Sequence, residues 1–237
     1  VLPYFKKSED NPTFAGSPYH GLGGPMSVTS LPRFNPLIHS FLEATNSLQL
    51  SHCEDFNGSD PEGFGTRQAA IRNGRRESGT TAFLRPAMKR PNLRVITRAQ
   101  VSKVEIRDGR AVGVSILGED GTQTIGASRE VILSGGAYGS PAMLLLSGIG
   151  PADELKALGI ASVLDLPGVG KGLRDHPSAA IQVRTKDTAS YGISWRKAIP
   201  NAIDGLRYLL FRKGPIAGNM FEAHGFWRSR AEEARPD

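Results

Sequence analysis

The stretch EVILSGGAYGSPAMLLLSGIGP (residues 130–151) decides the fold class of this chain. Its first five residues, EVILS (130–134), form a short apolar run of the kind that builds a buried β-strand. GGAYGS (135–140) follows, and Pro141 then opens PAMLLLSG, because proline is favoured at the first position of a helix. A strand, a glycine-rich turn and a helix in this order predict an α/β architecture, in which backbone N–H groups at the helix N-terminus can approach ligand oxygens.

The glycine turn alone is compatible with two roles. GGAYGS lacks the GxGxxG spacing of dinucleotide-binding turns, and no acidic residue stands about 20 positions further on at the end of a second strand. The turn could therefore contact a ligand phosphate, or it could serve only the close packing of a strand against a helix.

An antiparallel β-meander is predicted directly before this stretch, because four extended runs are separated by the hairpin turn sequences DGR and GEDG. The runs are LRVIT (93–97), VSKVEI (101–106), AVGVSIL (111–117) and TQTIGA (122–127). Together with the strand, turn and helix, they predict a fold of mixed α/β and α+β character.

The rest of the chain gives further elements. Residues 1–36 are rich in proline and glycine, which favours extended, turn-rich chain. Helical spacing or proline position predicts helices over 36–47, 80–90, 152–160 and 196–212, the second of them broken or kinked at Pro86, and Asn73-Gly74 predicts a turn. Alternation of apolar and polar residues predicts strands in AIQVRT (180–185) and NMFEAHGFWRS (219–229), and VLDLPGVGKGLRDHP (163–177) is a loop long enough to be functional.

Composition excludes several classes of protein. A length of 237 residues allows one large or two modest domains, and the single cysteine, Cys53, cannot form an internal disulfide. No apolar run approaches the roughly 20 residues that span a bilayer, and the N-terminus shows no signal peptide. We therefore expect a cytoplasmic protein, with peripheral membrane association as an alternative. The net charge of +6 comes from scattered cations, which indicates a solvated basic face more than a nucleic-acid surface.

Residues 136–151, GAYGSPAMLLLSGIGP, resemble the second signature of the glucose-methanol-choline (GMC) flavoprotein oxidoreductases. Further segments follow in the order that this family shows, and together they cover essentially the whole chain. They are YFKKSED (4–10), HGLGGPMSV (20–28), DFNG (55–58), the run 72–97, the run 158–177 and NMFEAHGFWRSR (219–230). The bacterial choline-dehydrogenase-like or alcohol-dehydrogenase-like branch is the most similar.

The resemblance implies an FAD cofactor and oxidation of the CH–OH group of an alcohol, choline-like or another primary alcohol, by hydride transfer to the flavin. It does not indicate the electron acceptor. The family's N-terminal GxGxxG and its C-terminal catalytic histidine have no counterpart here, so we expect a central fragment that carries no catalytic residue and is inactive alone. The expected parts are a covering segment (1–19), substrate-domain parts with an antiparallel sheet (20–77 and 178–237) and part of a Rossmann-like FAD-binding domain (78–177).

The resemblance also assigns individual residues. Val101 matches a valine whose backbone contacts the adenine, and Ser134, Gly135, Gly136 and Ala137 match the edge beside the cofactor. Two departures put polar contacts in doubt, since GLRDHP replaces the usual NLQDHP and ESGTTAFL replaces a Ser-Ala-Ala-type run.

Glu222 and His224 would share a strand face toward the substrate, where a carboxylate could hold a cationic group. A glutamate on a strand is more often solvated, and that alternative stays open.

Other residues invite chemistry but favour structural roles. His176, in the RDHP loop, is expected to be structural or to belong to a cofactor loop, and Asp175 to bind backbone N–H groups of that loop. His20 is expected to be a hydrogen-bonded residue at the entrance of a strand, with a ligand contact as the alternative. Cys53 has no adjacent base and is expected to be inert.

Two hypotheses from other classes compete with the oxidoreductase. The chain could be a stand-alone, non-catalytic α/β binding module, or a basic protein associated with nucleic acid. A flavin absorbance spectrum separates the oxidoreductase from both, and salt-dependent binding to nucleic acid would favour the last.

Overall fold

The computed structural model describes residues 1–31, 35–118, 121–183, 195–219 and 221–236. The chain forms two compact units, Val1–Arg94 with Val183–Asp237, and Val95–Gln182. Both contain helices and strands, so the mixed fold class is confirmed. The division falls at 94/95 and 182/183, whereas the sequence placed it at 77/78 and 177/178. The assignment of these parts to cofactor and substrate stays a prediction.

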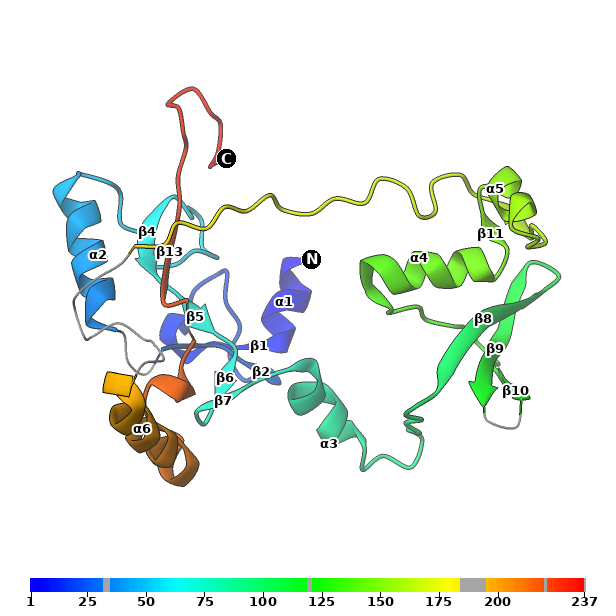
Figure 1. Cartoon of the computed structure of the whole chain (residues 1–237), viewed down its shortest axis with the longest axis horizontal. Coiled ribbons are helices and arrows are strands. Elements are labelled where there is room, and N and C mark those ends of the chain that lie inside the picture. The colour runs from blue at the N-terminus through cyan, green and yellow to red at the C-terminus, as the bar shows by residue number, and fades with distance from the viewer. Residues whose placement is uncertain (32–34, 119–120, 184–194, 220, 237) are drawn as a thin grey trace. The chain divides into compact units, whose positions relative to one another are not determined.

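The second unit, 95–182, contains the predicted meander (Figure 1). Its strands are β8 (Gln100–Arg107), β9 (Arg110–Gly118) and β10 (Gly121–Gly126), paired antiparallel in the order β10-β9-β8. Asp108 and Gly109 form the β8–β9 turn with φ of 49° and 71°. Two positive φ values are what a type I′ hairpin needs, so the DGR turn signal is confirmed.

Two predicted strands of this region are wrong. LRVIT (93–97) and EVILS (130–134) have no strand structure, and Ile132 within EVILS is 76% exposed. Each run has strand composition, but a strand is stable only when its peptide groups pair with a neighbour. No described segment of the chain pairs with either run.

The glycine turn does lead into a helix, α4 (Gly136–Leu146). This helix begins five residues before Pro141, so the prediction that Pro141 is its first residue is wrong. A parallel pair follows, β11 (Ile149–Gly150) with β12 (Leu164–Asp165), connected through α5 (Ala152–Ala157). Leu155 of α5 is 1% exposed and is the most deeply buried apolar residue there.

The first unit is built from short strand pairs and peripheral helices. β1 (Glu9–Asp10) pairs parallel with β2 (Met26–Ser27), and the antiparallel pairs are β3 (Thr29–Ser30) with β5 (Gln68–Ala69), β6 (Ile71–Arg72) with β7 (Arg75–Arg76), and β4 (Gly63–Thr66) with β13 (Ala223–Phe226). The helices are α1 (Leu2–Ser8), α2 (Pro36–Ser47), α3 (Arg85–Ala87) and α6 (Ala198–Phe211), with a π-helical turn at Thr80–Leu84 and 3-10 turns at Pro12–Phe14, Trp195–Lys197 and Pro215–Ala217.

Most expectations for this unit hold. The helix over 36–47 is confirmed, and the Asn35 side chain caps it by accepting the Leu37 N–H at 3.0 Å. Asn73 and Gly74 form the predicted turn with φ of 53° and 68°. Residues 2–8 are helical rather than extended, since Pro3 suits a first helical turn. Residues 180–183 of AIQVRT form no strand, and residues 184–185 lie outside the described part of the chain.

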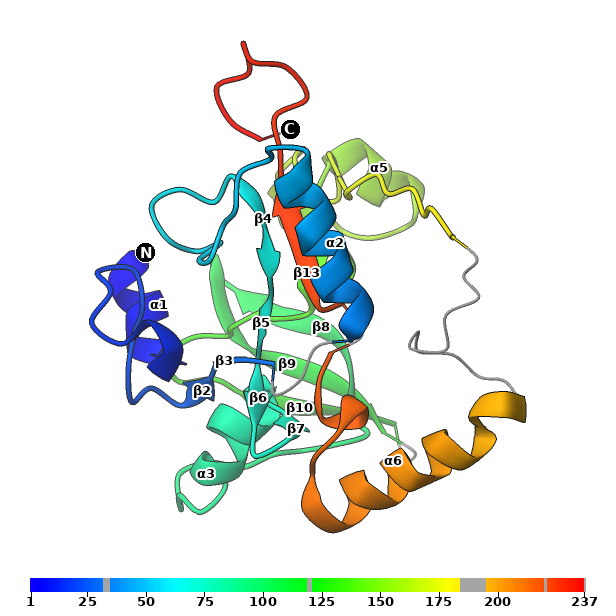
Figure 2. The same cartoon turned by 90° about the vertical axis from the view of Figure 1, so that its left-hand side faces the viewer.

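The β4–β13 pair joins segments far apart in sequence, and α2 lies beside it (Figure 2). Phe41 of α2 packs edge-on against Phe64 of β4, with ring centroids 6.1 Å apart. This contact holds α2 against the β4–β13 pair. His224 lies within β13, and Glu222 directly precedes that strand.

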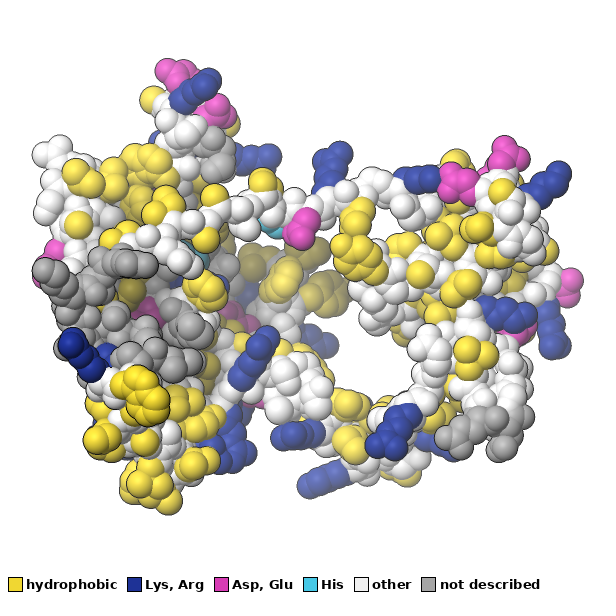
Figure 3. All heavy atoms as spheres, viewed as in Figure 1, with side chains coloured by type: hydrophobic (Ala, Val, Ile, Leu, Met, Phe, Trp, Pro, Cys, Tyr) yellow, Lys and Arg dark blue, Asp and Glu magenta, His cyan; other side chains and the backbone are white. Residues whose placement is uncertain are grey.

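Figure 3 shows Lys and Arg side chains dispersed over the visible surface of each of the two units. Among the residues that the structure describes, no helix is both long and apolar enough to cross a membrane.

Candidate functional site

The glycine turn before α4 has a backbone that only glycine fits. The Gly135 N–H donates to Ser140 Oγ at 2.9 Å, and a Cβ on Gly135 would stand 2.9 Å from the backbone of Gly139 and Ser140. Gly136 has φ of +74°, a conformation that L side chains rarely adopt. Gly135 is therefore required by a close backbone approach, and Gly136 by its positive φ.

This turn presents its backbone to solvent. Ser134, Gly135, Gly136 and Ala137 are all exposed, and no side chain caps the N-terminus of α4. The first N–H groups of a helix have no partner within it, and they carry partial positive charge. The structure thus brings these four predicted residues together at one exposed turn, where the Gly135 N–H is already bonded to Ser140 and the N–H groups of the first helical turn remain as donors.

Val101 lies on β8, an edge strand of the meander, and is half-buried opposite Ile116. Ser147, just after α4, ties this strand to the helix, because its hydroxyl accepts the Val104 N–H at 2.8 Å and donates to the Met143 carbonyl at 2.6 Å. Val101 and the turn at 134–137 belong to one unit, although no hydrogen bond between described residues joins them directly.

His20 is the centre of a buried polar cluster in the first unit. Its Nδ1 lies 3.1 Å from the Glu9 carboxylate, its Nε2 lies 3.0 Å from the Asp55 carboxylate, and its ring stacks on Phe14 with centroids 5.0 Å apart. Burial alone would lower the pKa of His20, but hydrogen bonds to Glu9 and Asp55 raise it overall. Burial likewise opposes ionisation of Glu9, while hydrogen bonds from Gly21 and His20 bring its pKa below the ordinary value.

The expected hydrogen bonding of His20 is therefore confirmed. It occupies the loop six positions before β2 rather than a strand entrance. Its partners come from Glu9 and from Asp55, which lies 35 positions away, so no local sequence signal could have identified them.

Glu222 lies just before β13 and is 4% exposed, so the solvated alternative is wrong. Its carboxylate accepts the N–H of Asn35, the residue that caps α2, and its carbonyl accepts the Arg67 N–H at 2.9 Å. His224 has different neighbours, since its ring stands edge-on to Phe56 at a centroid distance of 3.8 Å. The two residues were expected to share a strand face, but Glu222 precedes β13, and no contact between their side chains is seen among the described residues.

His224 borders a cavity of about 310 Å³ that Asp55, Arg67 and Gln68 also line. Its Nε2 is buried and has no hydrogen-bond partner among the described residues. Burial, and then the charge of Arg67, lowers the pKa of His224. The imidazole is therefore a neutral group at the edge of a polar cavity.

Two more predicted residues lie in the exposed loop after β12. Asp175 accepts the N–H of His176 at 2.8 Å, which agrees with its expected role in binding loop backbone, and both side chains are exposed.

Cys53 is buried, and burial raises the pKa of its thiol, which agrees with an inert cysteine.

A buried carboxylate that sequence analysis missed is Glu77. It accepts hydrogen bonds from the Thr81 hydroxyl and from Arg72, whose Nε lies 2.5 Å away. The Thr81 hydrogen bond is the main reason that the pKa of Glu77 is lowered, against the effect of burial. Glu77 thereby anchors the β6–β7 hairpin to the π-helical turn that follows it.

Comparisons with known proteins identify relatives that match this chain over its whole length. A family model described as GMC oxidoreductase matches residues 1–178. The chain is 41% identical to an oxygen-dependent choline dehydrogenase of Rhizobium meliloti (strain 1021), covering 100% of this chain and 43% of that protein. It is 42% identical to an alcohol dehydrogenase [acceptor] of Pseudomonas putida, covering 98% of this chain and 43% of that protein.

Solved structures of oxidoreductases also match this chain. An FAD-dependent oxidoreductase from Chaetomium thermophilum matches with a TM-score of 0.81 and 28% identity, over 95% of this chain and 42% of that chain. A pyridoxine 4-oxidase from Mesorbium loti matches with a TM-score of 0.64 and 34% identity, over 70% and 33% of the respective chains. The chain thus spans about 43% of the length of the curated relatives that it matches.

Proposed function

Because this chain belongs to the GMC oxidoreductase family, we propose that it forms part of an FAD-dependent enzyme that oxidises the CH–OH group of an alcohol. The observation that supports this most directly is the turn at 134–137, an exposed and uncapped helix N-terminus whose two glycines are required by the backbone. The competing hypotheses of a non-catalytic binding module or a nucleic-acid-associated protein have no comparable feature in their favour.

The donors in the second unit fit FAD. Exposed N–H groups at the start of α4 suit the oxygen atoms of the cofactor, and the peptide groups of an edge strand at Val101 suit the donor and acceptor atoms of adenine. FAD, when bound, would supply the acceptor for a hydride from the alcohol carbon. The residues of this chain would hold and orient the cofactor, and we assign the proton transfer to none of them.

The contact at Ala137 can be tested by removing one N–H in the complete enzyme. Proline is tolerated in the first turn of a helix, so Ala137→Pro should leave α4 folded while deleting a donor. Loss of one hydrogen bond to a charged group should weaken FAD binding about tenfold. Ala137→Ser keeps the N–H and should retain FAD. The assignment fails if Ala137→Pro releases FAD no faster than the parent at an unchanged unfolding temperature.

The adenine contact at Val101 has its own test. Val101→Ile preserves the extended backbone and should bind FAD as the parent does, whereas Val101→Pro removes the N–H and should weaken retention. If Val101 only packs, Val101→Ala would lower the stability by about 1–3 kcal/mol without changing FAD affinity in the folded protein. FAD dissociation and thermal unfolding of all three variants decide between the two roles.

We propose that Glu222 contacts the cationic group of a choline-like substrate. In support, its carboxylate is buried and has a further oxygen besides the Oε2 that accepts the Asn35 N–H. Glu222→Gln keeps an acceptor for Asn35 and removes only the charge. KM for choline should rise about tenfold, while KM for an uncharged primary alcohol should not change. An equal change for both alcohols would leave Glu222 with only its structural hydrogen bond to Asn35.

Other parts of the proposal rest on the sequence. A cytoplasmic location stays a prediction, with peripheral membrane association as its alternative. The electron acceptor that reoxidises the flavin is not assigned.

A further inference from the structure

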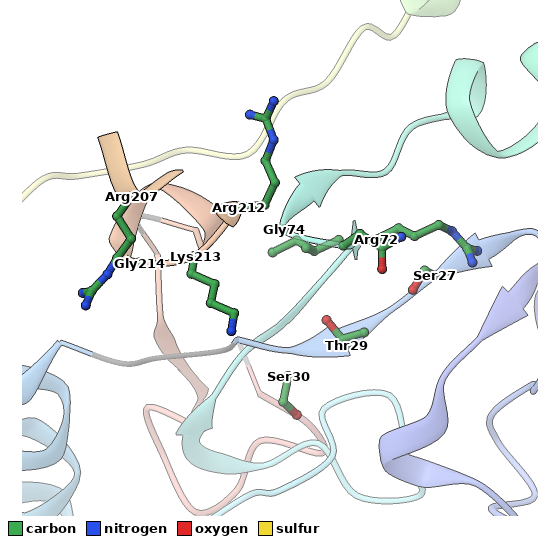
Figure 4. A pocket seen from close by; sticks show the side chains of 11 residues that line it. Ser27, Thr29, Ser30, Arg72, Gly74, Arg207, Arg212, Lys213 and Gly214 are labelled. Carbon is green, nitrogen blue, oxygen red and sulfur yellow. The ribbon is translucent and has the colours of Figure 1, made fainter. Parts of the chain in front are cut away.

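A pocket of about 650 Å³ opens in the first unit, beside β3, the tip of the β6–β7 hairpin and the C-terminal end of α6 (Figure 4). This volume lies within the range of about 300–1,000 Å³ that is typical of small-molecule sites. None of the residues assigned to the cofactor or the substrate lines it.

The charge of the pocket is strongly one-sided. Arg72, Arg207, Arg212 and Lys213 line it, and the described lining residues include no aspartate or glutamate. Arg72 is largely neutralised, because its guanidinium pairs with Glu77 at 2.5 Å and with Asp10 at 4.0 Å.

The other three cations form no ion pair with any described carboxylate. Asp204 of α6 lies beside Gly214, yet it pairs with none of Arg207, Arg212 and Lys213. Like charges that form no ion pair repel one another, and an anionic ligand would relieve that repulsion.

Hydroxyl groups add neutral donors to the same pocket. The side chains of Ser27 and Thr29 form no hydrogen bond with a described residue, and Ser30 has only a long contact of 3.4 Å with Thr13. In Figure 4, Lys213 extends toward the strand that carries Thr29 and Ser30. An ammonium group and free hydroxyls around one space are the donor types that bind oxyanions.

Backbone packing holds the two walls together. Gly74 at the hairpin tip has φ of +68°, and a Cβ there would stand 2.1 Å from the Arg212 carbonyl oxygen. Arg212 ends α6 in the left-handed conformation, with its N–H on the Tyr208 carbonyl at 2.9 Å and its guanidinium 4.9 Å from the centre of the Tyr208 ring. The hairpin and the helix end thus meet in a defined geometry, which is required for a specific site.

We infer that this pocket binds a small organic anion through a phosphate or carboxylate group. The oxyanion would lie between Lys213 and the hydroxyls of Ser27 and Thr29, while Arg207 and Arg212 line the same pocket and add positive charge. This inference does not depend on the flavin.

Titration calorimetry of the full chain tests the site, with inorganic phosphate and citrate as separate probes at constant ionic strength. The double variant Lys213→Gln, Arg207→Gln keeps the side-chain stems and removes two charges. It should weaken binding of whichever probe binds by tenfold or more. Lys156→Gln, an exposed lysine of the second unit, is the matched control and should bind as the parent does.

Saturable binding that the double variant loses and the control keeps supports the site, and the tighter probe identifies the oxyanion. The inference is wrong if neither probe binds saturably, if the double variant binds like the parent, or if Lys156→Gln causes the same loss. None of these outcomes involves FAD or alcohol oxidation, so failure here leaves the proposed function untouched.

Discussion

Nε2 of His20 lies 3.0 Å from both carboxylate oxygens of Asp55, although 35 positions separate the two residues. On its other side the same imidazole meets Glu9. The ring therefore connects β1 with two loops of the first unit, beside the cavity that Asp55 and His224 line. A buried cation between two carboxylates is costly to disrupt, because removing it leaves uncompensated charge.

His20→Gln should lower the free energy of unfolding by about 1–3 kcal/mol, and more at acidic than at alkaline pH. The folded pKa of His20 is raised above 6.5, so its contribution is complete below pH 6.5 and is lost as pH rises through the folded pKa. Urea unfolding of the parent and the variant at about pH 5.5 and pH 9 measures the difference.

His52→Gln is the control for that experiment, since His52 is an exposed histidine of the same unit. It should change the stability by less than about 0.5 kcal/mol at either pH. A His20→Gln effect that is equal at both pH values would mean that the imidazole is not charged in the cluster.

His224 should show the opposite pH dependence. Its folded pKa is lowered by burial, so its neutral form is favoured and its contribution is lost as pH falls from 6.5 through the folded value. His224→Leu removes the titrating ring. As pH falls from about 7.5 to 5, the free energy of unfolding of the variant should therefore rise relative to that of the parent. The free energy of unfolding of both proteins is measured by denaturant unfolding across this pH range. If it depends on pH in the same way in parent and variant, His224 is not a buried neutral imidazole.

Local sequence signals predicted the elements that local physics determines. The Asp108-Gly109 and Asn73-Gly74 turns need positive φ, and Pro36 after Asn35 starts a helix, so these features follow from a few adjacent residues. The strand LRVIT failed because pairing depends on a distant neighbour that its own residues do not specify.

The site shows the same distinction. The turn and the helix after residue 134 were predicted because the glycines and the helix are contiguous in sequence, and the assignment of residues 134–137 to the cofactor came from the family resemblance and stays a prediction. The cluster of Glu9, His20 and Asp55 and the pocket lined by Arg207 and Lys213 were missed, because their members meet only when segments far apart in the sequence fold together.

Ser147→Ala should destabilise the second unit by about 1–3 kcal/mol, because it leaves the buried Val104 N–H without its partner. Ser128→Ala, at an exposed serine whose hydroxyl bonds no described residue, should have little effect. Hydrogen exchange at the Val104 amide gives a local readout and should become faster only in Ser147→Ala. Unchanged exchange there would show that Ser147 does not anchor β8 to α4.

Three glycines around the start of α4 should respond differently to alanine. Gly136→Ala forces a Cβ into φ of +74° and should cost about 1–2 kcal/mol, although the space around it is open. Gly135→Ala should also destabilise, because its Cβ would stand 2.9 Å from backbone atoms that cannot move aside independently. Gly139 lies in the helix with no described atom near its Cβ position, so Gly139→Ala should be neutral or should stabilise by about 0.5–1 kcal/mol. Thermal unfolding of the three variants checks this order, and a Gly136→Ala variant as stable as Gly139→Ala would show that the turn does not require its left-handed backbone.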